Sequence, residues 1–295
     1  MIRPRSFGHG RNLSAISAVK LTIAALATFI AQVVGMSVAA MFVVKRDVNV
    51  QDAMTIGQQA ALTMAGGIAA LVCAIIAVSF VRCCVNVLPL RRCTQCGYDL
   101  AGLSEVATCP ECGTINTGPP MAPPQAPPAW SVVPRATDFV RGALSMIVAA
   151  PIVLAAGALA ALAYRIVVGH QPDTLAHDTL RAILDDRHNP AVPILIAAAV
   201  VVGPIVEELL FRVFIQSALL KATGRTWPAI LSTSILFTAA HIGGGVRPED
   251  AQALVPLFIL SLCLGVAYER TGRMWVPITM HMLFNAANVA VALMM

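Results

Sequence analysis

The chain has 295 residues and a formal net charge of +5, with 58% hydrophobic residues and only 12% charged ones. Soluble globular domains carry about 25% charged residues, so this composition excludes an ordinary soluble protein and predicts that most of the chain lies in lipid. Basic residues that flank membrane spans account for the small basic excess. The composition therefore predicts no nucleic-acid partner.

Long runs without charge indicate the membrane spans, because a helix needs about 20 mostly apolar residues to cross a bilayer. We predict an all-α fold, a polytopic helical membrane bundle of about seven spans, in which the fourth span is long and the fifth is short. The predicted spans are Leu21–Val44, Gly57–Val81, Ala143–Tyr164, Ala191–Leu220, Trp227–Ile242, Ala251–Tyr268 and Met274–Met295.

The distribution of Lys and Arg predicts the orientation, since basic residues concentrate in short cytoplasmic loops. They are frequent in the N-terminal tail, in segment 82–142 and in the loops after the fourth and sixth spans, whereas Asp is frequent in the loop after the third span. We therefore predict a multi-pass protein of the cell membrane with its N-terminus and segment 82–142 in the cytoplasm and its C-terminus outside.

A cysteine-rich segment follows the second span and reads "RRCTQCGYDLAGLSEVATCPECGT". It holds two C-x-x-C pairs, and four thiolates at this spacing are typical of a closed, tetrahedral structural zinc site. A pair of disulfides or a redox dithiol is the alternative, but a cytoplasmic location disfavours disulfides. We predict a small cytoplasmic zinc ribbon whose Zn ligands are Cys93, Cys96, Cys109 and Cys112.

Paired prolines in "TGPPMAPPQAPPAWSVVP" predict an extended linker after the ribbon. The chain is thus expected to divide into an N-terminal tail with two spans (1–92), the ribbon (93–113), the proline-rich linker (114–140) and a five-span membrane domain (141–295). A cytoplasmic protein that binds the ribbon is a further predicted partner, inferred from this arrangement alone.

Charged residues interrupt one of the most apolar parts of the chain, "PIVEELLFRVFIQ". Each ionisable group at the centre of a membrane helix costs about 2.5–3.5 kcal/mol on insertion scales, and such groups usually mark pathways, relays or catalytic sites. Glu208 and Arg212 are four residues apart and share a helix face, so they can form a pair, whereas Glu207 lies on another face. A purely structural ion-pair network is the alternative.

Two later spans also carry polar residues at helical spacing. "FTAAH" places Phe237 and His241 four residues apart, and "HMLFN" does the same for His281 and Asn285. A lone membrane histidine is often just bonded to a backbone carbonyl, but two of them on separate helices, together with Glu207, favour a common site. A carboxylate and an imidazole that flank one water form a general base, and a second histidine with an asparagine amide can stabilise an oxyanion. This set suits amide hydrolysis within the membrane.

These residues resemble the E-E-x-x-x-R, F-x-x-x-H and H-x-x-x-N motifs of the CPBP family, also called the CAAX protease and bacteriocin-processing (Abi) family. The three motifs occur here in family order, and the resemblance covers about residues 140–295. It implies a helical intramembrane endopeptidase of the glutamic type, in which Glu207 and His241 activate water, His281 and Asn285 form the oxyanion hole, and the supporting residues are Glu208, Arg212 and Phe237. The implied substrate is a membrane-embedded or membrane-anchored protein or peptide, and catalysis needs no cofactor.

Two other interpretations of the polar residues stay open at this stage. A proton-linked transporter or a scaffold would use them as a relay or as structural contacts, and would string them along a path through the membrane. The second interpretation is that one glutamate and the two histidines bind a zinc ion, although the H-E-x-x-H motif of zinc proteases is absent.

Overall fold

The computed structural model describes residues 15–43, 55–82, 93, 95, 107–116, 133–170, 183–184, 186–242 and 251–294. Within these ranges the chain is almost entirely helical, and six helices are long and apolar enough to cross a membrane. A seventh, shorter apolar helix lies at Thr226–Ala239, where the sequence predicts the short span. The prediction of a polytopic helical bundle is thereby confirmed.

The helices follow the predicted spans closely, because each predicted run is bounded by charged or turn-forming residues. The elements are α1 (Ala15–Val43), α2 (Ile56–Arg82), α3 (Ala136–Val168), α5 (Val192–Ala197), η2 (Ala198–Val202), α6 (Gly203–Glu208), η3 (Leu209–Gln216), α7 (Ser217–Thr223), α8 (Thr226–Ala239), α9 (Ala251–Thr271) and α10 (Trp275–Met294). Helix α3 begins at Ala136 and so already includes the end of the range predicted as linker.

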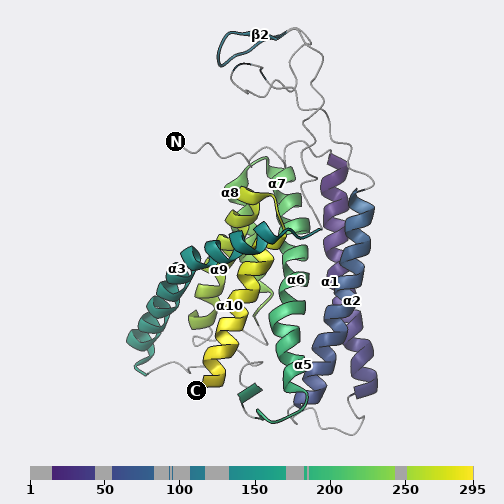
Figure 1. Ribbon diagram of the computed structural model, residues 1–295, viewed down its shortest axis with the longest axis vertical. Coiled ribbons are helices and arrows are strands. Elements are labelled where there is room, and N and C mark those ends of the chain that lie inside the picture. The colour runs from purple at the N-terminus through teal and green to yellow at the C-terminus, as the bar shows by residue number, and fades with distance from the viewer. Residues whose placement is uncertain are drawn as a thin grey trace.

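The fourth span is one long helix that runs through the bundle and comprises α5, η2, α6, η3 and α7 (Figure 1). Helices α1 and α2 lie on one side of it, and α3, α8, α9 and α10 lie on the other. The largest buried apolar cluster joins both sides to the long helix, since it contains Leu21 of α1, Ala74 of α2, Phe214 of η3, Phe237 of α8 and Ile278 of α10. The N-terminal hairpin is therefore packed into the same core as the C-terminal helices.

Two short strands lie beyond one end of the bundle (Figure 1). Strand β1 (Ala107–Thr108) pairs antiparallel with β2 (Ile115–Asn116). Gly113 has a φ of +73°, which an L side chain rarely adopts, and its N–H donates to Cys109 O over 2.9 Å. This is the tight turn that the C-x-x-C pair at Cys109 and Cys112 predicts.

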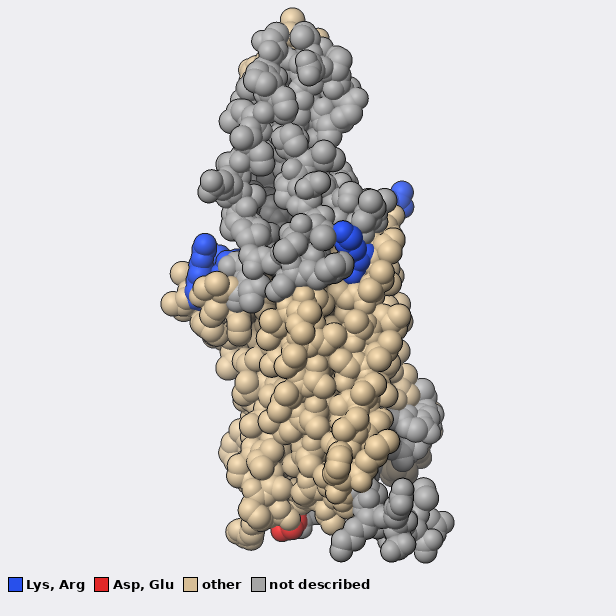
Figure 2. All heavy atoms as spheres, turned by 90° about the vertical axis from the view of Figure 1, so that its right-hand side faces the viewer, with Lys and Arg blue, Asp and Glu red and all other residues tan. Residues whose placement is uncertain are grey.

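Charged side chains mark the two ends of the bundle. On the face drawn in Figure 2, Lys and Arg lie at the upper end of the apolar body, and acidic side chains lie at its lower end. An uncharged band separates them, which is the pattern of a protein that spans a bilayer. The prediction that the basic end faces the cytoplasm stays a prediction.

Candidate active site

The long fourth helix departs from α-helical geometry on either side of its carboxylates. Segments η2 and η3 are π-helical, and the Gly203 N–H donates to Ala198 O, five residues earlier. Pro204 follows directly and has no N–H of its own, so it removes one bond from the regular ladder. The sequence predicts a kink at Pro204, and in the structure the π-helical segment η2 ends at Val202, two residues before this proline. Such segments are frequent at functional sites because they turn side chains out of helical register.

Glu207 faces two histidines from two other helices. Its Oε2 lies 3.7 Å from His241 Nε2 at the end of α8 and 3.8 Å from His281 Nε2 in α10. Both distances exceed a direct hydrogen bond, and Glu207 Oε2 has no hydrogen-bond partner although the atom is buried. The predicted convergence of Glu207, His241 and His281 is thus present in the geometry.

The other ring nitrogen of each histidine has a fixed partner. His241 Nδ1 lies 2.8 Å from Phe237 O, and His281 Nδ1 lies 3.0 Å from Glu208 Oε1. A carbonyl or a carboxylate oxygen only accepts, so each Nδ1–H donates. In the neutral form of both imidazoles, Nε2 is then an unprotonated acceptor aimed at Glu207.

Glu208 and Arg212 form the pair that their spacing predicts. Arg212 Nε donates to Glu208 Oε2 over 2.9 Å, and both side chains are fully buried. Arg212 also donates through one terminal nitrogen to Ser261 Oγ of α9 over 3.0 Å. The second Glu208 oxygen accepts from His281, so Glu208 joins the long helix to α10. This link between Glu208 and His281 was not foreseen, because nothing in the sequence fixes how α6 packs on α10.

Phe237 packs against Arg212 and against both histidines. Its ring centroid lies 4.7 Å from that of His241 and 5.8 Å from that of His281, and Arg212 Cζ lies 5.3 Å from the same centroid. The side chain is fully buried. The supporting role expected of Phe237 stays a prediction.

Asn285 lies one helical turn beyond His281, and its Nδ2 donates to Ala199 O in η2 over 2.8 Å. This bond uses one of the two N–H groups of the amide. The predicted site residue therefore also ties α10 to the first π-helical segment, a contact that sequence reasoning missed. Its assignment to an oxyanion hole stays a prediction.

Two further buried polar contacts lie away from the histidines and were not predicted. Gln216 Nε2 donates to Glu269 Oε1 over 2.9 Å, and Arg273 Nε donates to Asp138 Oδ1 over 3.0 Å. A charged residue directly after an apolar run, as at Glu269, or in the first turn of a helix, as at Asp138, is the signal that marks them. The second contact anchors the start of α3 to the turn before α10.

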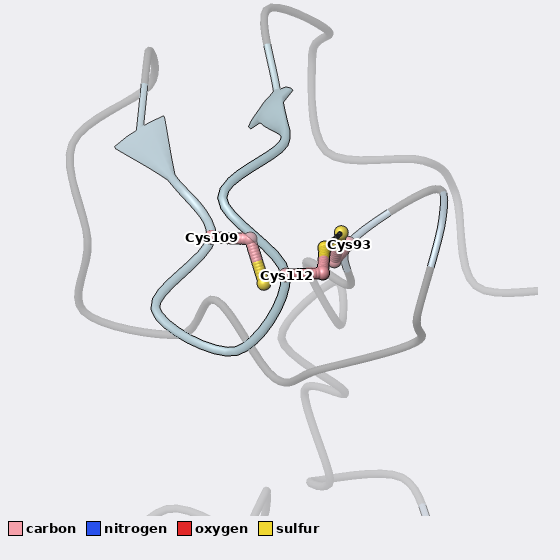
Figure 3. A group of neighbouring side chains, drawn as sticks. All are labelled: Cys93, Cys109 and Cys112. Carbon is pink, nitrogen blue, oxygen red and sulfur yellow. Dashed lines mark hydrogen bonds between the residues drawn. The ribbon is translucent and has the colours of Figure 1, made fainter.

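Three of the four predicted zinc ligands lie together next to the β1–β2 hairpin (Figure 3). The ligand atoms of Cys93, Cys109 and Cys112 all lie within 4.8 Å of one another, so this group could hold a metal ion. Cys93 Sγ and Cys112 Sγ are 3.5 Å apart, close to the ~3.8 Å separation of thiolates around a tetrahedral zinc with Zn–S bonds of about 2.3 Å. Cys96 lies outside the described residues.

Fold and site together define a polytopic membrane protein with a carboxylate and two imidazoles converging inside its helical bundle. Residues 189–287 match the protein family described as "Type II CAAX prenyl endopeptidase Rce1-like". This part of the chain is similar to that family, and it contains all three motifs on which the resemblance rests.

Two curated proteins are similar to part of the chain. "Putative membrane peptidase YdiL" of Bacillus subtilis (strain 168) is 33% identical over 116 residues, which are 39% of this chain and 43% of that protein. "Uncharacterized 24.3 kDa protein" of Escherichia coli is 28% identical over 108 residues, which are 36% of this chain and 48% of that protein. The matches thus span about half the length of these relatives. No solved structure matches the protein.

Proposed function

We propose that the protein is an intramembrane endopeptidase that hydrolyses a peptide bond in a membrane-embedded or membrane-anchored protein or peptide. The observation that carries this proposal is the position of Glu207 Oε2, buried and unpartnered between the Nε2 atoms of His241 and His281. Contacts of 3.7–3.8 Å between polar atoms suit groups that share one water molecule. The similarity of residues 189–287 to a family of membrane endopeptidases supports the same reaction class.

In the proposed reaction, Glu207 accepts a proton from the water while His241 orients it. The hydroxide equivalent attacks the scissile carbonyl carbon, and the tetrahedral oxyanion then accepts hydrogen bonds from the Asn285 amide and from Nε2–H of His281, which donates in the protonated form of the ring. Collapse of this intermediate breaks the C–N bond, and the proton held by Glu207 passes to the leaving amine. Glu208 and Arg212 support the site, because Glu208 fixes the ring of His281 and Arg212 neutralises Glu208.

The partly open position of Glu207 suits a substrate that approaches the site from outside the helical bundle. Its side chain is 29% exposed and that of His241 is 23% exposed, whereas His281 is buried. Water and a substrate backbone can therefore approach Glu207 and His241, while the interior side of the site stays closed.

A panel of membrane-anchored peptides incubated with the purified full-length protein in nanodiscs tests this function. We expect cleavage by the wild type to survive EDTA, and we expect His241→Ala to lower kcat by about 10²–10⁴-fold, the usual contribution of a positioned acid–base group. Cleavage that EDTA abolishes, and that added zinc restores in a variant lacking the ribbon cysteines, would instead favour a Glu–His–His metal site.

The clustering of Glu207, His241 and His281 disfavours the transporter interpretation, which requires polar groups along a path through the membrane. Proteoliposomes with an internal pH dye separate the two functions. We expect no proton flux above that of empty liposomes under an imposed pH gradient. A flux that Glu207→Gln abolishes would contradict the endopeptidase assignment.

We also propose that the cysteine segment is a structural zinc ribbon in which Cys96 completes the site formed by Cys93, Cys109 and Cys112. Four thiolates leave no open coordination position, so this zinc takes no part in hydrolysis. The basic residues at the same end of the bundle support a cytoplasmic location of the ribbon, where it can bind a protein partner or present a substrate.

Metal analysis tests the zinc ribbon. The purified wild type is expected to contain one zinc ion per chain, and Cys109→Ser is expected to lose it, because a buried thiolate ligand is removed. Elemental analysis of the two proteins gives the stoichiometry, and Cys263→Ser in α9 is the matched control. Equal zinc content in wild type and Cys109→Ser would contradict the ribbon.

A further inference from the structure

Helix α2 lies outside the residues that match the endopeptidase family, yet it contacts the segment that precedes Glu207. It packs against α5, η2 and α6 of the long fourth helix. One contact between α2 and η2 is at Gly67, which is buried. A Cβ atom placed on Gly67 would lie 2.7 Å from Cγ1 of Val202, a distance that real Cβ atoms essentially never reach. Only glycine therefore lets α2 approach η2 this closely.

Val202 cannot easily move out of the way of a larger residue at position 67. Its branched side chain has one strongly preferred rotamer in a helix, and it is the last residue of the π-helical segment η2. On the opposite side of η2, Asn285 of α10 binds Ala199 O over 2.8 Å. Segment η2 is thus held between α2 and α10, and a displacement at Val202 is transmitted along its backbone.

The carboxylate of Glu207 rests directly on the residue that follows Val202. A Cβ atom on Gly203 would lie 3.6 Å from Glu207 Oε1, so the Glu207 side chain folds back over this glycine. A shift of Val202 would therefore move the surface that supports Glu207 relative to His241 and His281. These two histidines are carried by α8 and α10, so their distances from Glu207 would change.

We propose that Gly67 is a positioning residue for hydrolysis, because its lack of a side chain allows α2 to fix η2 and thereby the carboxylate of Glu207. The inference rests on the proposed function. Helix α2 of the N-terminal hairpin would then contribute to the geometry of the active site, in addition to connecting the membrane domain to the ribbon.

Three glycines of one helix provide the test. Gly67→Ala is expected to lower kcat by about 10- to 100-fold, the effect of a misplacement of about 1 Å at a reacting group, with KM almost unchanged. Gly57→Ala is the matched control, because a Cβ there meets nothing within 4 Å, and it should keep the wild-type kcat. Gly66→Ala meets Met36 Cγ of α1 at 2.5 Å, so it should lower Tm without lowering the kcat of the folded protein.

Rescue distinguishes positioning from general damage to the fold. Val202→Ala removes the atom that a Cβ at position 67 would strike, so the double variant Gly67→Ala/Val202→Ala should recover most of the lost kcat. A wild-type kcat in Gly67→Ala, the same loss in Gly66→Ala, or a double variant as impaired as Gly67→Ala would each overturn the proposal.

Histidine NMR tests the positioning without any substrate. In protein labelled on its imidazole rings, Gly67→Ala is expected to shift the resonances of His241 and His281, and Gly57→Ala is not. Unchanged resonances in Gly67→Ala would overturn the positioning role whether or not the protein cleaves peptides. Equal cleavage by wild type and Glu207→Gln, by contrast, would overturn the proposed function itself.

Discussion

Glu207→Gln is expected to lower kcat for peptide cleavage by about 10²–10⁴-fold, because an amide cannot accept the proton that a general base must remove from water. Glutamine has nearly the same shape as glutamate, and Glu207 Oε2 makes no hydrogen bond that the fold depends on. The variant should therefore keep the Tm and the KM of the wild type. Initial rates in nanodiscs over a range of substrate concentrations give kcat and KM separately.

Glu269→Gln is the matched control for Glu207→Gln, because it neutralises another glutamate of a membrane-spanning helix. Glu269 contacts Gln216 and lies in α9, away from the histidines. We expect it to keep the wild-type kcat. Similar losses of kcat in both variants would show that neutralising either glutamate impairs cleavage to the same extent, and Glu207 would then have no special role.

Glu208→Leu is expected to reduce the free energy of unfolding by about 3–5 kcal/mol, the cost of removing one partner from a buried ion pair. Arg212 would lose its carboxylate, and His281 Nδ1 would lose its acceptor. Both side chains would remain buried without the carboxylate that pairs with them. Unfolding of the purified protein in mixed detergent, followed by circular dichroism, measures this loss.

The double variant Glu208→Leu/Arg212→Leu serves as the control for Glu208→Leu. Replacing both members of a buried pair by apolar residues is often neutral, whereas removing one leaves an unpaired charge. The double variant should therefore be more stable than Glu208→Leu, although neither is expected to be active. A single variant as stable as the wild type would contradict the structural role of the pair.

The sequence predicted the membrane helices well because the bilayer imposes a length and a composition that are visible in one chain. The fifth span, predicted as short, corresponds to α8 of only 14 residues. The pairing of Glu208 with Arg212 also followed from helical spacing, and it is confirmed. The prediction that Glu207 lies on a different helix face from this pair is also correct, since consecutive helical residues point in different directions.

The π-helical segments could not be predicted in the same way, because apolar periodicity assumes an α-helical repeat. Pro204 indicated a local irregularity, but not that η2 and η3 would flank the carboxylates. The contacts between helices could not be predicted from the sequence either. Neither Glu208 with His281 nor Asn285 with Ala199 has a signal in the sequence, since each depends on how two distant helices pack.

The N-terminal hairpin, formed by α1 and α2, shares its buried core with the C-terminal helices. The sequence separated residues 1–92 from the membrane domain at the ribbon and the linker, and that division stays a prediction. In the folded chain, Leu21 of α1 and Ala74 of α2 belong to the same buried cluster as Phe237 and Ile278. Removing the hairpin would therefore expose the core around the long fourth helix.

A double-mutant cycle of Glu207→Gln and His241→Ala tests the central claim most directly. The four proteins are compared by kcat on one cleaved peptide, in nanodiscs and in EDTA. If both side chains act on one water molecule, the double variant should lose hardly more activity than the more impaired single variant, because residues that act as a unit are strongly non-additive. Independent losses that multiply in the double variant, or equal rates in all four proteins, would contradict a water activated jointly by Glu207 and His241.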